Sequence, residues 1–375
     1  MKKNYTVLCS SCGTRSPRES ELRCRVCGSV LDTRVTITNA KKSSFLYHGA
    51  RMWQFRSFLP VTEDEEVVTL GEGLTPLCEH VSEDLPKLFF KVEYINPTCS
   101  FKDRSASLLL TKAKSSRSKS VVIDSSGNAA ASISAYAARG GMECDVFVPS
   151  STSPAKLKQI ESYGASVRKV EGTRNDVLNA AVKFATENSK YYCGFQLNPF
   201  ATDALKTIAY EIALQCGEAL PDYVMLPMGT GGLLIGCSKG FKDLLSLKWI
   251  AARPKIVGVQ PEGCSPIAKA FLSGKKIVPV DHPETVAEGL KIGNPLKGET
   301  AVKSIRESGG LALTVTDDEI LQAGEYAAKR CGLFVEPSGA VSLAGLFKLV
   351  REGRISKKGR AACLLTGSGL KHLKA

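Results

Sequence analysis

The sequence has no long apolar run, only four histidines and few aromatic residues (7%). None of its apolar stretches approaches the roughly 20 residues that a helix needs to cross a membrane. The opening residues, Met1–Tyr5, are not followed by the apolar core of a signal peptide. We therefore expect a soluble, cytoplasmic protein with no membrane partner.

The chain also lacks the compositional bias of disordered or fibrous proteins, since 43% of its residues are hydrophobic and 23% charged. Its 375 residues exceed the size at which one hydrophobic core stops growing, so two lobes are expected. The net charge of +13 raises the question of nucleic-acid binding. However, the cations are dispersed, and even the densest stretch, Lys112–Lys119, has no aromatic residues among them. Nucleic acid is therefore not expected as the main partner.

Cysteine is abundant, with 13 residues, and two C-x-x-C pairs stand near the amino terminus. Cys9 with Cys12 and Cys24 with Cys27 are each followed by glycine, as in the knuckles of a zinc ribbon. Four thiolates leave no open coordination position, so the predicted zinc site is structural, and iron is an alternative metal for the same ligands. The alternative without a metal is a set of redox-active or incidental cysteines. Residues 1–33 are predicted to form this module, and the polar stretch Thr33–Ser44 a linker.

From about residue 65 onward, short apolar strands alternate with helical stretches. This alternation predicts an α/β fold with mostly parallel sheets and with ligands at the carboxyl ends of the strands. The strand candidates are Leu88–Val92, Ser120–Ile123, Cys144–Val148, Ser166–Val170, Tyr223–Leu226, Lys255–Val259 and Ala361–Leu365.

Three loops that follow predicted strands carry unusual residues. Ser125–Ser132 opens a helix whose free amides could bind a carboxylate, and Gly229–Gly232 could fold its amides around a phosphate. The third loop begins at Thr366, whose hydroxyl could bind a ring nitrogen. Each loop taken alone is also explained by ordinary turn chemistry.

Taken together, five segments resemble the fold-type II enzymes that use pyridoxal phosphate (PLP), the tryptophan synthase β family, and most closely threonine synthases. They are Gly71–Leu77, Asn96–Arg104, Val257–Cys264, Glu336–Ala340 and Thr366–Lys371. The resemblance spans about residues 45 to 373 and implies two lobes with mostly parallel sheets. The expected domains are 34–110 and 204–375 for the large PLP domain and 111–203 for the small domain, after the zinc-ribbon-like module.

The resemblance also implies roles for single residues. Lys102 would hold PLP as a Schiff base and move protons at the substrate, and Thr366 would face the pyridine nitrogen. Asn128 would contact the cofactor's 3′-hydroxyl. The remaining assignments are Gly229, Thr230, Gly231 and Gly232 for the cofactor phosphate, and Ser125, Ser126 and Ala129 for the carboxylate of an amino-acid substrate. The alternative for Lys102 is an exposed lysine paired with Asp103.

This chain departs from the threonine synthase pattern at the expected site for the substrate phosphate. Phe195 and Gln196 stand where Asn-Ser is usual, and Ala201 stands where an Arg is expected. Cys99 and Ser105 replace glycines beside the lysine. Lys206 and Lys156 are candidates for the missing charge.

Three functions therefore stay open. The first is a threonine synthase, which converts O-phospho-L-homoserine and water to threonine and phosphate. The second is PLP-dependent β-elimination or β-replacement on serine, threonine or phosphoserine, as in threonine dehydratase or cysteate synthase. The third is a non-catalytic regulator. Enzymes of this family are commonly homodimers, but the sequence does not determine the number of subunits.

Overall fold

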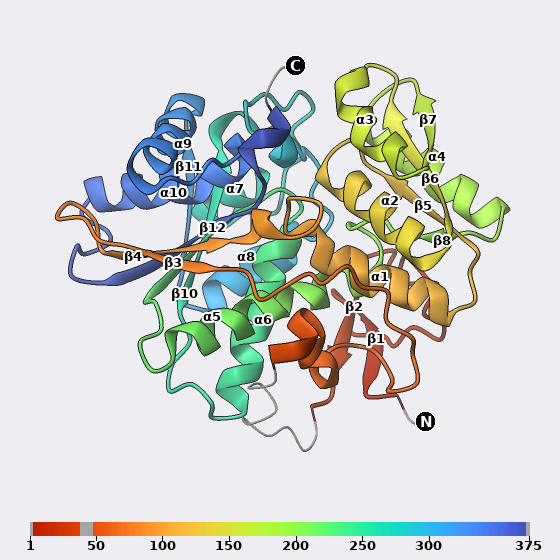
Figure 1. Cartoon of the computed structure of the whole chain (residues 1–375), viewed down its shortest axis with the longest axis horizontal. Coiled ribbons are helices and arrows are strands. Elements are labelled where there is room, and N and C mark those ends of the chain that lie inside the picture. Colours follow the sequence, from red (N-terminus) through yellow and green to blue (C-terminus); the bar gives the residue numbers. More distant parts are fainter. Residues whose placement is uncertain (1–2, 38–47, 373–375) are drawn as a thin grey trace. The chain divides into compact units, whose positions relative to one another are not determined.

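A computed structural model describes residues 3–37 and 48–372 of the chain. The chain divides into two compact units. Unit 1 comprises Met1–Glu72 and Asn96–Ala204, and unit 2 comprises Gly73–Ile95 and Leu205–Ala375. Each unit contains a sheet with helices packed on it (Figure 1), which confirms the predicted α/β class with mostly parallel sheets.

Unit 1 contains a four-stranded parallel sheet in the order β7-β6-β5-β8. Its strands are β5 (Ser120–Asp124), β6 (Glu143–Pro149), β7 (Ser166–Val170) and β8 (Tyr191–Tyr192). Its helices are α1 (Lys102–Ser115), α2 (Asn128–Gly140), α3 (Pro154–Ser162) and α4 (Arg174–Glu187). The valine and isoleucine side chains of β5 are buried in succession, as in parallel strands covered on both faces. Helix α2 packs on β5 and β6 and also against α1, so the helices headed by Lys102 and Asn128 are neighbours.

The amino-terminal module is a two-stranded antiparallel sheet in unit 1. Strand β1 (Tyr5–Cys9) pairs with β2 (Leu31–Val35), and Tyr5 lies opposite Val35. The prediction of a linker beginning at Thr33 is therefore wrong, because Thr33–Val35 complete β2. Thr33 and Val35 are β-branched residues, which suit a pleated strand, and the Thr33 side chain is buried. Residues 38–44 of the expected linker lie outside the described residues.

Unit 2 contains a six-stranded sheet in the order β11-β10-β9-β12-β4-β3, parallel except for the edge strand β3. Its strands are β3 (Leu77–His80), β4 (Lys87–Val92), β9 (Tyr223–Pro227), β10 (Lys255–Pro261), β11 (Leu311–Val315) and β12 (Arg360–Leu365). Its helices are α5 (Lys206–Cys216), α6 (Gly232–Ser246), α7 (Pro266–Ser273), α8 (Gly298–Glu307), α9 (Asp317–Cys331) and α10 (Pro337–Arg351). Helix α10 packs on β9, β10, β11 and β12, whose apolar side chains form the core of this unit.

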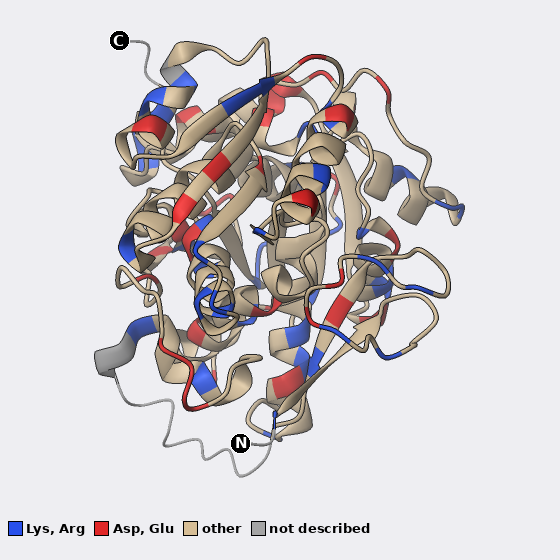
Figure 2. Ribbon diagram, turned by 90° about the vertical axis from the view of Figure 1, so that its right-hand side faces the viewer, with Lys and Arg blue, Asp and Glu red and all other residues tan. Residues whose placement is uncertain are grey.

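Short 3-10 helices connect several elements. They are η2 (His48–Phe58), η3 (Glu93–Ile95), η4 (Pro199–Leu205), η5 (Glu262–Cys264), η6 (Glu288–Leu290) and η7 (Gly369–His372). Figure 2 shows Lys and Arg interspersed with Asp and Glu along the ribbon. Among the described residues, no helix is both long and apolar enough to cross a membrane.

Candidate active site

Lys102 is the first residue of α1 and follows a tight turn. In that turn the Cys99 amide donates to the Asn96 carbonyl (2.7 Å), and Cys99 adopts a left-handed φ of 62°. Glycine adopts this conformation without strain, so a cysteine here carries a backbone strain that glycine would not. The Lys102 ammonium lies 4.2 Å from the ring centroid of Phe101 and 5.2 Å from that of Phe195. Cation–π contacts with both rings therefore hold the amine at the head of the helix.

Asp103, which follows the lysine, is fully buried. Its carboxylate accepts hydrogen bonds from the Thr98 amide (2.6 Å), the Thr98 hydroxyl (2.5 Å) and the Ser132 hydroxyl (2.5 Å). Burial raises the pKa of Asp103 to about 6, although these three donors lower it. An exposed ion pair between Asp103 and Lys102 is excluded by this burial. Asp103 instead ties the turn before Lys102 to α2, a role that the sequence did not reveal.

The loop Ser125–Ala129 leaves β5 and enters α2, as predicted. Gly127 is the N-cap residue, and no described side chain caps the helix. Its first amides are therefore of the kind that binds an anion such as a carboxylate. Ser125, Ser126, Asn128 and Ala129 are all half-buried.

Hydrogen bonds to Asp124 hold the end of β5, from which this loop begins. Asp124, the last residue of β5, accepts hydrogen bonds from the Tyr192 hydroxyl (2.5 Å) and from Nη2 of Arg174 (2.5 Å). Burial raises the pKa of Tyr192 well above its ordinary value, so its hydroxyl stays a donor to Asp124. Sequence reasoning missed both partners because they lie about 50 residues or more along the chain from Asp124.

The segment Phe195–Ala201, hereafter the 195–201 segment, lies against α1 within unit 1. Phe195 contacts Lys102, and the Ser105 hydroxyl donates to the Ala201 carbonyl (2.7 Å). Asn198 shapes the segment, since its amide donates to the Tyr192 carbonyl (2.8 Å) and its oxygen accepts from the Phe200 amide (3.0 Å). The stretch that departs from the threonine synthase pattern is therefore next to the lysine.

Lys206 and Lys156 are the candidates for the positive charge that Ala201 does not supply, and neither belongs to the 195–201 segment. Lys206 begins α5 in unit 2, is 2% exposed and lies 3.2 Å from the Asp243 carboxylate, so its charge is already paired. Lys156 is an exposed residue of α3.

In unit 2, Gly229–Gly232 form the turn between β9 and α6. Gly231 has a φ of 87°, and a Cβ there would lie 2.9 Å from the Cβ of Ala301, so the turn requires glycine. Gly232 is the first residue of α6, a helix of 15 residues with no side-chain cap among the described residues. A glycine turn at the start of such a helix fits a phosphate group, because the amides and the helix dipole both favour an anion.

Thr366 follows β12 and is 3% exposed. It packs on the start of α10, where a Cβ on Gly339 would lie 3.0 Å from the Thr366 amide nitrogen and 3.4 Å from its hydroxyl oxygen. Glu336 donates its amide to the Gly367 carbonyl (3.0 Å). Two motifs that the sequence singled out, Glu336–Ala340 and Thr366–Lys371, therefore pack together in unit 2.

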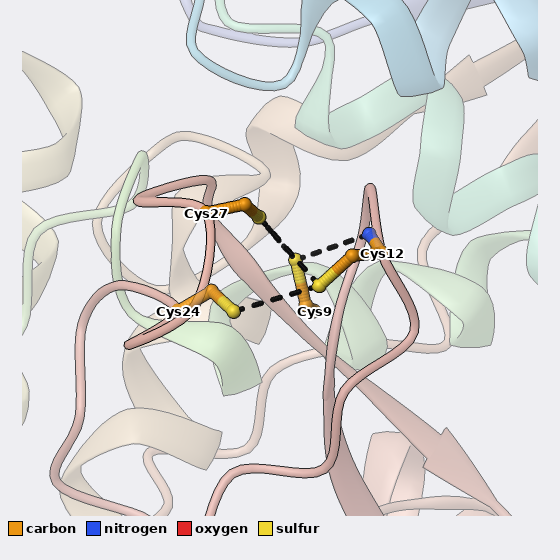
Figure 3. A group of neighbouring side chains, drawn as sticks. All are labelled: Cys9, Cys12, Cys24 and Cys27. Atoms are coloured by element: carbon orange, nitrogen blue, oxygen red, sulfur yellow. Dashed lines mark hydrogen bonds between the residues drawn. The ribbon is translucent and has the colours of Figure 1, made fainter.

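The four amino-terminal cysteines converge, as predicted from their spacing (Figure 3). The sulfur–sulfur distances are 3.4 Å for Cys9 and Cys27, 3.7 Å for Cys12 and Cys24, and 3.6 Å for Cys12 and Cys27. A tetrahedral zinc with bonds of about 2.3 Å would place its sulfurs about 3.8 Å apart. A hydrogen bond with Thr14 lowers the pKa of Cys12 to about 6, which favours its thiolate, whereas burial raises the pKa of Cys9 to about 11. The donor set therefore fits a tetrahedral metal ion.

Comparisons with known proteins agree with this geometry. The family model for pyridoxal-phosphate dependent enzymes matches residues 68–367. The threonine synthase of Methanocaldococcus jannaschii is 40% identical over 85% of this chain and 80% of its own, and that of Methanosarcina acetivorans is 37% identical over 98% and 92%. Among solved structures, a fungal L-serine ammonia-lyase from Rhizomucor miehei is 21% identical with a TM-score of 0.70, covers 81% of this chain and 95% of its own, and shares the fold. The chain belongs to the family of pyridoxal-phosphate dependent enzymes.

Proposed function

We propose that this protein is a threonine synthase, which converts O-phospho-L-homoserine and water to L-threonine and phosphate. The observation that carries the proposal is the 40% and 37% identity to threonine synthases over most of both chains. The geometry around Lys102 supports it, because an amine at a helix start is held by two rings, and the neighbouring helix α2 begins with amides that no described side chain caps.

We assign the cofactor residues as follows. Lys102 and Asn128 of unit 1 would hold PLP through its aldehyde carbon and its 3′-hydroxyl. Gly229–Gly232 of unit 2 would bind its phosphate, and Thr366 its ring nitrogen. The glycine turn and the helix start behind it support the phosphate assignment. Bound PLP would supply an electron sink for negative charge at the carbon next to the substrate amine.

Residues of the protein would bind the substrate, transfer its protons and exclude water. The substrate carboxylate would bind Ser125, Ser126 and the amides at the start of α2, including that of Ala129. The Lys102 amine would carry protons between Cα, Cβ and Cγ. In the overall reaction the Cγ–O bond breaks and phosphate leaves, Cγ gains a proton, and Cβ loses a proton and gains the hydroxyl of water. Phe101 and Phe195 would exclude bulk water from the amine, and Asp103 would hold its turn in place.

One observation favours a second candidate, a β-elimination or β-replacement enzyme that acts on serine, threonine or phosphoserine. The 195–201 segment carries no Lys or Arg, and the ring of Phe195 lies 5.2 Å from the Lys102 amine. Without a guanidinium there, a substrate phosphate has no bidentate partner on that segment.

A substrate panel tests the proposal. Purified enzyme with PLP is incubated with O-phospho-L-homoserine, with phosphoserine plus sulfite, and with threonine. Release of phosphate together with threonine from the first substrate alone is expected. Product from either of the other two substrates and none from the first would instead establish the second candidate.

Lys102→Ala should lose the visible absorption band of the bound cofactor and at least about 10²- to 10⁴-fold in rate, the usual contribution of a general acid–base. Lys114→Ala is the matched control on the same helix. Its ammonium is partly exposed and pairs with Glu66 (2.5 Å), so band and rate should stay at wild-type levels. A Lys102→Ala protein that keeps the band would reject the assignment of this lysine.

We further propose that Cys9, Cys12, Cys24 and Cys27 hold a structural zinc ion. The convergence of the four sulfurs and their mutual distances support this assignment, and four thiolates leave no open position for catalysis.

A further inference from the structure

A buried lysine joins the amino-terminal module to the helix that begins at Lys102. Lys112, on the last turns of α1, is 4% exposed. Its ammonium donates to the Tyr5 hydroxyl (2.7 Å) and to Glu65 (2.9 Å) and lies 3.3 Å from Glu19. The Tyr5 hydroxyl in turn donates to Glu19 (2.8 Å). Tyr5 and Glu19 both belong to the module that carries the four cysteines.

The same cluster contacts the 195–201 segment. The Lys112 ammonium lies 5.0 Å from the ring centroid of Phe200, and the Tyr5 ring meets that ring edge-on at 5.8 Å and 85°. Phe200 is 1% exposed, so this contact is fully enclosed. At its other end the segment places Phe195 beside the Lys102 amine. The segment is therefore in contact with the module at Phe200 and with the lysine at Phe195.

We propose that Tyr5 and Lys112 position the 195–201 segment. The amino-terminal module would thereby determine where this segment, including Phe195, lies relative to Lys102 on the substrate side of the active site. The inference rests on the proposed function, because it assumes that this segment lines the substrate site next to the departing phosphate. Close-packed interiors transmit displacement, and an error of about 1 Å in a catalytic group can cost about 100-fold in rate. Tyr5 and Lys112 are positioning residues: Lys112 is ten residues along α1 from Lys102, about 15 Å, and Tyr5 contacts the helix at Lys112.

The module's contribution can be separated from the stability of α1. Glu65 lies outside the module and keeps Lys112 paired when Tyr5 is changed. Replacing the Tyr5 ring with an aliphatic side chain therefore removes the contact with Phe200 without leaving a buried lysine unpaired.

The experiment compares Tyr5→Leu, which removes the ring and the hydroxyl, with Tyr5→Phe, which keeps the ring. Tyr5→Leu should raise the KM for O-phospho-L-homoserine at least about fivefold. This rise is smaller than the ~100-fold loss of rate that a 1 Å error in a catalytic group causes, because the segment is displaced and not the lysine. It should change kcat less and should shift the visible absorption of the bound cofactor, because Phe195 moves relative to Lys102. Tyr5→Phe should restore most of the KM and the wild-type spectrum.

Two further variants complete the design. Asn4→Ala removes a different contact of the module, since Asn4 donates to the Ser57 carbonyl (3.3 Å), and should leave KM and spectrum unchanged. Phe200→Leu disturbs the contact from the segment's side and should reproduce the KM rise, which also decides the question if Tyr5→Leu does not fold. Folded, metal-loaded Tyr5→Leu with the wild-type KM and spectrum would overturn the inference. Absence of wild-type activity on O-phospho-L-homoserine would reject the proposed function, whereas the spectral comparison would still test the positioning.

Discussion

At the scale of single residues, a buried carboxylate stands directly beside the lysine that we assign to PLP. Asp103 is fully buried and is hydrogen-bonded only through neutral donors in its recorded contacts, the Thr98 amide and the hydroxyls of Thr98 and Ser132. Desolvation exceeds the effect of these donors, so its pKa rises from 3.8 to about 6. Because the folded protein binds this proton more tightly than the unfolded chain, Asp103 contributes stability below about pH 4, and this contribution is lost as the pH rises through about 6.

We predict that the stability of Asp103→Asn relative to wild type improves as the pH rises. An amide has no ionisation cost in the buried site, so between about pH 4 and pH 7 the difference in unfolding free energy should shift toward the variant by up to about 3 kcal/mol. Urea unfolding of both proteins at several pH values measures this difference. Ser134→Ala, a change to a buried hydroxyl on the same helix α2 whose recorded partner is Cys144, is the control and should show no such trend. A constant difference for Asp103→Asn across this range would contradict the raised pKa.

At the scale of elements, a buried ion pair joins β4 to α5 in unit 2. Lys91 and Glu211 are both fully buried, with 2.7 Å between Nζ and Oε2. Lys91 also donates to the Thr75 carbonyl (2.7 Å), and Glu211 accepts the amides of Leu74 (2.9 Å) and Thr75 (3.3 Å). The pair therefore anchors the Gly71–Leu77 motif as well as the two elements.

Lys91→Met should destabilise the protein by about 3–5 kcal/mol, because it removes the ammonium that lies 2.7 Å from the buried Glu211 carboxylate. Adding Glu211→Gln should recover a large part of this loss, since the glutamine oxygen still accepts the two backbone amides. Denaturant unfolding of wild type, the single variants and the double variant gives the coupling energy. Strictly additive effects of the two substitutions would show that the charges do not depend on each other.

The same elements show what sequence alone could predict. Leu88–Val92 and Ala361–Leu365 are apolar enough to read as strands, and they are found as β4 and β12. The sequence does not reveal strand β3, because it is a four-residue edge strand with no buried side chain, and the polar end of β2, residues 33–35, resembles a linker. The motif around Lys102 is one continuous segment, so the sequence alone predicts it. The contacts of Asp103 with Ser132, of Phe195 with Lys102 and of Tyr5 with Phe200 join distant parts of the chain, so no local pattern could predict them. The cytoplasmic location and the homodimer stay predictions.

At the scale of the whole molecule, the amino-terminal module is joined to the core of unit 1. Cys9, Cys24 and Leu31 belong to the same buried cluster as Leu108 of α1 and Ile133 of α2. Loss of metal from the module should therefore lower the stability of unit 1 as a whole, and not only that of the β1–β2 sheet. The thiolates must be deprotonated to bind metal, so affinity should fall as the pH drops and protons compete for the four sulfurs.

We predict one zinc ion per chain in protein purified at neutral pH, measured by elemental analysis. Cys24→Ser should abolish stoichiometric zinc and lower the midpoint of thermal unfolding by several degrees, because a structural metal site contributes folding free energy. Cys331→Ser, which changes a partly buried cysteine of α9 outside the module, should keep both the metal and the midpoint. If Cys24→Ser retains a full equivalent of zinc, the four-thiolate site is not where the metal binds. If instead it loses zinc with an unchanged midpoint, the module folds independently of its metal, and the stability of unit 1 comes from apolar packing and the Lys112 cluster alone.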